Sequence, residues 1–70
     1  MTLWVSVAYG VGPDGTGRRT VRLDVGGEPA DAGRRCRWQY EREHGTDPTG
    51  VSTAAVPERL MLQAMGGDNT

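Results

Sequence analysis

The fold is decided by residues 2–25, TLWVSVAYGVGPDGTGRRTVRLDV, in which two alternating runs flank a turn-forming hexapeptide. Every second residue is apolar from Leu3 to Val11, and the same alternation returns from Val21 to Val25. A period of two is typical of β-strands with one apolar face. Between the runs, GPDGTG (12–17) contains glycines, which accept positive φ, and Pro13, which presets the second position of a turn. The stretch therefore predicts a long β-hairpin.

A third strand is expected after a break. Residues 26–33 hold three glycines and a proline and predict a loop. In residues 34–43, Cys36, Trp38 and Tyr40 alternate with polar residues, which favours a strand. Helix is the alternative, because Arg, Gln and Glu are good helix formers. On a helix, however, Trp38 and Tyr40 would lie about 200° apart and form no common stripe, so we expect a strand.

The C-terminal part has the composition of a helix. Residues 45–50 form a second turn-rich break, and the helix is predicted over residues 52–65. Pro57 suits a first helical turn, Glu58 complements the positive end of the helix dipole, and Gly66 with Gly67 supplies the stop.

The predicted fold class is α+β, a small antiparallel three-stranded β-meander (β-β-β-α) with one C-terminal helix packed on one face. We expect one domain over residues 1–67 and a frayed tail over residues 68–70. The helix would cover the apolar side of the sheet. It would contribute Leu60, Ala64 and a methionine to a buried layer whose sheet residues are Val5, Val7, Tyr9, Val21, Leu23, Trp38 and Tyr40.

Length and composition limit the functional classes. A chain of 70 residues buries only about 60% of its unfolded surface, so its core is thin. Its single cysteine excludes an internal disulfide, and we expect support from self-association or a protein partner. The net charge of -1 offers no overall attraction to nucleic acid or to an anionic membrane.

The expected location is the cytoplasm. No apolar run approaches the roughly 20 residues of a membrane span, and no secretion signal is visible. The chain lacks Lys, Ile and Phe, whose codons are AT-rich. We therefore expect a protein of a GC-rich bacterium or its phage.

No catalytic, cofactor or metal site is expected. Cys36, His44 and Asp47 contain the elements of an activated thiol. On a strand, however, Cys36 would point with Trp38 and Tyr40 into the core and pack as a small hydrophobe. The same three residues lack the paired spacing of a metal site.

Two binding surfaces are predicted, and the apolar helix is the first. Its stripe is too wide for one sheet face, because Leu60 and Leu62 lie about 200° apart. Either Leu62 is a single exposed leucine, which is unremarkable, or the stripe contacts another chain. The predicted protein interface consists of Leu60, Met61, Leu62 and Met65.

The second surface is the predicted polar side of the sheet, which would carry arginines around one aromatic ring. These side chains could bind phosphates and stack on bases, or they could be a solvated surface on which arginine stems cover Trp4. The candidate anion- or nucleic-acid-binding residues are Trp4, Arg22, Arg35 and Arg37.

The predicted function is a non-enzymatic interaction module that associates with itself or docks on a larger protein assembly. Nucleic-acid binding through the arginine-bearing face is the alternative, and an enzyme is the third possibility.

Overall fold

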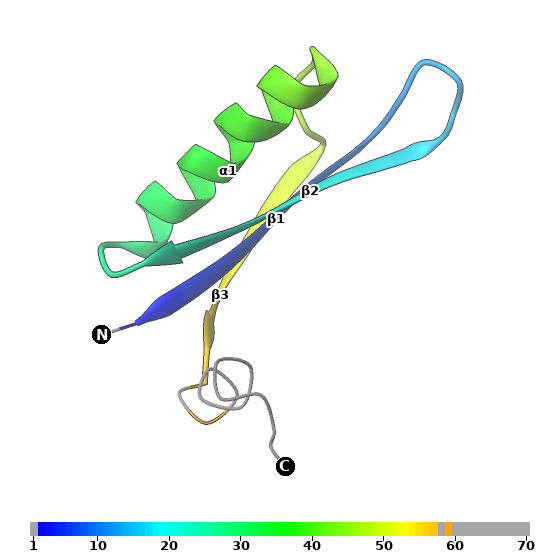
Figure 1. Ribbon diagram of the computed structural model, residues 1–70. Helices are drawn as coiled ribbons and strands as arrows, with labels where there is room; N and C mark the ends of the chain where they lie inside the picture. Colours follow the sequence, from blue (N-terminus) through cyan, green and yellow to red (C-terminus); the bar gives the residue numbers. More distant parts are fainter. Residues whose placement is uncertain (1, 58, 60–70) are drawn as a thin grey trace.

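The computed structural model describes residues 2–57 and 59. In chain order these residues form β1 (Leu3–Val11), β2 (Gly17–Val25), α1 (Pro29–His44) and β3 (Gly50–Val56). The strands make one antiparallel sheet in the order β2-β1-β3, and α1 lies across one face of it (Figure 1). The predicted α+β class, with three antiparallel strands and one helix on one face, is confirmed. None of the helices in the described part is long and apolar enough to cross a membrane.

The predicted hairpin is confirmed. β1 and β2 pair in register from Leu3 opposite Val25 to Val11 opposite Gly17. At the turn, the Gly15 amide donates a hydrogen bond to the Gly12 carbonyl at 2.9 Å. Gly15 has φ of 82°, a left-handed conformation that glycine adopts without a Cβ clash.

The predicted third strand over residues 34–43 is wrong, because this segment is part of α1. The helix begins at Pro29, whose missing amide proton costs nothing in a first turn. It ends where Gly45 adopts φ of 77° and donates its amide proton to the Glu41 carbonyl. The buried residues Ala32, Cys36 and Tyr40 recur every four positions, as on one side of a helix.

The predicted order of elements is also wrong. Residues 52–56, expected to open the C-terminal helix, belong to β3, which is rich in the β-branched residues that favour strands. β3 pairs with β1, with Leu3 opposite Val56, and the helix precedes it in the chain. The sheet is therefore not a meander, and β1 is its central strand. Of the predicted helix, residues 58 and 60–65 lie outside the described residues.

The helix covers the side of the sheet opposite to the predicted one. It packs over the even-numbered residues of β1, so that Ser6, Ala8 and Gly10 are buried, together with Thr20 of β2. These residues are small, and a helix can therefore approach the sheet closely. The core is a cluster of Ala8, Cys36 and Tyr40, with Val51 packed against it. Most of the larger apolar residues of β1 and β2 face the other way.

Candidate functional site

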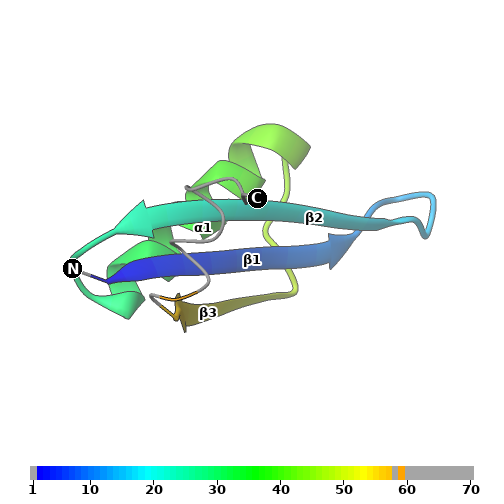
Figure 2. The same cartoon turned by 60° about the horizontal axis from the view of Figure 1, so that its bottom comes forward.

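The main surface feature is the side of the sheet turned away from α1, which we call the open face (Figure 2). It carries the odd-numbered residues of β1 and β2 and the even-numbered residues of β3, because side chains alternate along a strand and directly paired residues share a side. Its apolar members are Leu3, Val5, Val7, Tyr9, Val11, Val21, Leu23, Val25, Ala54 and Val56.

Several of these side chains are exposed to solvent. The exposed fraction is 65% for Val11, 56% for Val21, 60% for Leu23 and 63% for Val25. The ring of Tyr9 lies over Gly50 of the neighbouring strand, since a Cβ built at Gly50 would be 2.6 Å from the Tyr9 Cζ atom. The exposed apolar side chains of the open face therefore lie on residues 21–25 of β2 and at the hairpin end of β1.

The size of this surface is large for so small a molecule. Nine-residue strands are about 30 Å long, and three adjacent strands are about 14 Å wide, so the footprint is about 400 Å². The whole molecule exposes 4850 Å². The largest apolar patch of a typical soluble monomer is about 300 to 600 Å² and is often an interaction site. Among the described residues, the one Arg, Asp or Glu side chain on the open face is Arg19, near the hairpin turn.

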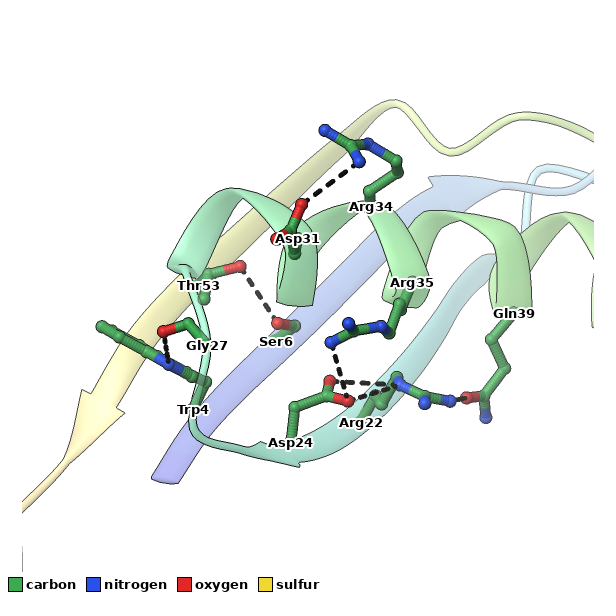
Figure 3. A network of polar contacts seen from close by, with 10 residues as sticks. All are labelled: Trp4, Ser6, Arg22, Asp24, Gly27, Asp31, Arg34, Arg35, Gln39 and Thr53. Carbon is green, nitrogen blue, oxygen red and sulfur yellow. Dashed lines mark hydrogen bonds and ion pairs between the residues drawn. The ribbon is translucent and has the colours of Figure 1, made fainter. Parts of the chain in front are cut away.

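The structure brings two of the predicted anion-binding residues together, around a carboxylate (Figure 3). The Arg22 Nε atom donates hydrogen bonds of 3.2 and 3.1 Å to the two Asp24 oxygens, and an Arg35 nitrogen lies 3.7 Å from the same carboxylate. The Arg22 guanidinium also donates a 2.9 Å hydrogen bond to the Gln39 side-chain oxygen. The Asp24 side chain is only 10% exposed, which reduces screening of both ion pairs by water.

The other two predicted residues lie apart from this cluster. The Trp4 indole nitrogen donates a 3.3 Å hydrogen bond to the Gly27 carbonyl, beside the loop that leads into α1. The Arg37 guanidinium lies 3.4 Å from Glu41 and 3.9 Å from Asp47. The prediction that all four project from an uncovered polar face of the sheet is wrong, because α1 covers that side and itself carries Arg35 and Arg37.

Two further carboxylates near the end of α1 have shifted pKa values. Hydrogen bonds from the Thr20 hydroxyl, at 2.7 Å, and from the Gln39 amide, at 3.0 Å, hold the pKa of Glu43 below its ordinary value of 4.5. The neighbouring Asp47 carboxyl raises the pKa of Glu41. Both glutamates lie at the surface, so these contacts position side chains and create no acid–base pair in a cleft.

The activated-thiol arrangement considered for Cys36 is absent. Its thiol is buried and donates a 3.5 Å hydrogen bond to the Thr20 carbonyl. His44 lies eight residues further along α1, about 12 Å along the helix axis, and its ring packs on Tyr40 with centroids 4.5 Å apart. The part of the chain that the structure describes holds no group of three side chains suited to a metal ion.

We expect Cys36 to react slowly with thiol reagents in the native protein at neutral pH. Burial raises the pKa of the Cys36 thiol, and the reactive thiolate is therefore scarce. A matched control is the Cys36→Ser/Thr46→Cys variant, whose thiol lies in an exposed loop. Stopped-flow absorbance with an aromatic disulfide measures both rates. Equal rates for the two proteins would contradict the buried assignment.

The predicted protein interface of Leu60, Met61, Leu62 and Met65 lies outside the described residues. Sequence reasoning missed the open face as a binding surface although it identified the apolar alternation, because it placed that side beneath the helix. The spacing of Ala32, Cys36 and Tyr40 is compatible with a helix that has a narrow buried stripe, but it does not distinguish a helix from a strand. No protein-family model, curated protein or solved structure matches the chain.

Proposed function

We propose that this chain is a small non-enzymatic protein-interaction module, and that the open face is its binding surface. The observation that carries the proposal is the exposure of large apolar side chains along residues 21–25 of β2 and at the hairpin end of β1. Val11, Val21, Leu23 and Val25 are each more than half exposed. Full burial of such a side chain stabilises by about 1.5 to 3 kcal/mol, so covering the open face would contribute several such increments.

The small core supports the same proposal. The residues between α1 and the sheet include Ser6 and Thr20, and the buried apolar cluster consists of Ala8, Cys36 and Tyr40. Domains of this size gain little from a single core and commonly rely on association for stability. A partner on the open face would supply the apolar burial that the interior lacks.

An enzymatic function has no support in the described residues. The hollow between α1 and β3 is lined by Gly33, Arg34, Arg37, Val51 and Thr53, among others. It does not contain the combination of nucleophile, base and oxyanion donor that hydrolytic or transfer chemistry requires.

Nucleic-acid binding stays a prediction of the sequence. Arg22, Arg35 and Arg37 each lie within 4 Å of a carboxylate oxygen, and paired guanidiniums attract phosphates less than free ones. The open face adds one arginine, Arg19. The composition supports the further proposal that the protein acts in the cytoplasm of a GC-rich bacterium, or of the host of its phage.

Site-specific photo-crosslinking tests the proposed function. Benzoylphenylalanine replaces Val21 on the open face or, as the control, Trp38 on α1, which is similarly exposed at 57%. Both proteins are irradiated in the cells that produce them. We expect protein adducts from position 21 and few from position 38, identified by mass spectrometry. Adducts that are absent at position 21, or equally abundant at both positions, would contradict the open face as the binding surface.

A further inference from the structure

We propose that the occupant of the open face is a second copy of this chain, packed sheet to sheet about a two-fold axis. The dimer then has four layers in the order helix, sheet, sheet, helix. This inference rests on the proposed function, and it names the partner that the open face binds.

The dimensions of the open face are those of a small dimer interface. Its footprint of about 400 Å² is a lower bound on the accessible area, because side chains project from the plane of the strands. A stable interface buries about 800 Å² per partner. The described apolar side chains span β1 and residues 21–25 of β2, and their projection from the footprint brings the area buried by two copies in contact toward that size.

The charge distribution selects the arrangement of the two copies. Arg19 lies toward the hairpin end of the open face, two residues from Val21. If the axis lies between the sheets, perpendicular to β1 and beside Val7, the strands of the two copies run antiparallel. The two Arg19 side chains then lie at opposite ends of the dimer, and like charges do not meet. Val7 and the adjacent Val21 occupy the centre, where packed apolar residues contribute most.

Other occupants cover the open face less completely. The predicted interface segment Leu60–Met65, if helical, would be about 9 Å long, about a third of the length of β1. If the edge strand β2 of one copy paired with β2 of a second copy, the sheet would be extended and the open face would stay exposed. Two-fold stacking of the sheets covers the whole surface with one interface, which is self-complementary by symmetry.

Sedimentation equilibrium over a range of concentrations tests the dimer. We expect twice the chain mass for the wild type. Leu23→Glu should weaken association about a hundred-fold, because it places an unpaired charge in an apolar interface. The matched control is Trp38→Glu on α1, where the replaced side chain is equally exposed, at 57% against 60% for Leu23. This variant should remain a dimer.

A second measurement does not depend on any variant folding. Wild-type protein labelled with ¹³C is mixed with unlabelled protein, and isotope-filtered nuclear Overhauser spectra detect contacts between copies. We expect contacts between the methyl groups of Val7, Val21 and Leu23 across the interface. Contacts confined to backbone protons of β2 would overturn the proposal in favour of edge pairing. Contacts within one copy from the open face to Leu60–Met65 would overturn it in favour of that segment.

The two proposals can fail separately. A wild type that stays monomeric at millimolar concentration overturns the second copy as occupant. If position 21 still crosslinks to a different protein, the open face remains the binding surface and the proposed function stands. If position 21 gives no adduct and the protein is monomeric, both proposals fail.

Discussion

Gly10→Val should destabilise the protein strongly and lower the urea concentration at which it unfolds. Gly10 lies on the helix side of β1, where a Cβ atom would meet the Tyr40 hydroxyl oxygen. The same Cβ would be 3.1 Å from the Tyr40 Cζ atom and 3.4 Å from the Thr49 backbone nitrogen, which is held by a 2.7 Å hydrogen bond to the Tyr9 carbonyl. Overpacking of this kind costs about 1 to 3 kcal/mol or more. The whole free energy of unfolding of a chain this long is about 4 to 10 kcal/mol.

The control is Gly17→Val, at the start of β2. A Cβ atom there has nothing within 4 Å, and valine favours strands, so this variant should unfold near the wild-type urea concentration. Far-ultraviolet circular dichroism at one fixed protein concentration measures both transitions. Gly10→Ala should also lower the free energy of unfolding less in a Tyr40→Phe protein than in the wild type, because Tyr40→Phe removes the hydroxyl that the new Cβ atom would meet. Equal urea midpoints for Gly10→Val and Gly17→Val would contradict the packing of α1 on β1.

Tyr40→Ala should destabilise the protein by about 3 to 5 kcal/mol, because removing a buried aromatic ring loses its transfer free energy and leaves a cavity. Tyr40 is 1% exposed and belongs to the largest fully buried side chains of the described residues. With Ala8 and Cys36 it forms the buried cluster between α1 and the sheet, and its ring packs on His44. Few other contacts in this core can compensate for the loss.

Trp38→Ala is the matched control for this prediction. Trp38 lies two residues earlier on α1 and is 57% exposed, so its removal should change the free energy of unfolding by about 0.5 kcal/mol or less. Thermal unfolding at the same protein concentration compares the two variants. A larger loss of stability in Trp38→Ala than in Tyr40→Ala would show that Trp38, and not Tyr40, is on the side of α1 that packs against the sheet.

The hairpin could be predicted from sequence because its signals are local. The turn residues Pro13 and Gly15 and the period of two on both sides act within 24 residues. β1 has the bounds of the first run, and β2 includes the whole second run and begins at Gly17, within the expected turn. The helix could not be assigned from the same kind of signal. Cys36 and Tyr40 satisfy a period of two and a spacing of four equally well. Pro29 and Gly45, interpreted as breaks, are the helix start and stop.

The side covered by the helix could not be predicted for a different reason. Alternation shows that the strands have an apolar and a polar side, but it does not show which side the chain's own helix covers. Here α1 packs on small residues, Ser6, Ala8 and Gly10, and this choice depends on tertiary packing. The apolar residues of the open face were therefore identified correctly and assigned to the wrong layer.

The central position of β1 has a consequence for the folding reaction. β1 pairs with β2 across a short turn, whereas its pairing with β3 joins distant parts of the chain, as in the hydrogen bond between the Ser6 and Thr53 hydroxyls, 47 positions apart. Closing a long loop costs conformational entropy before its contacts form. We therefore expect the hairpin to form early and the docking of β3 to be the slower, non-local step of folding.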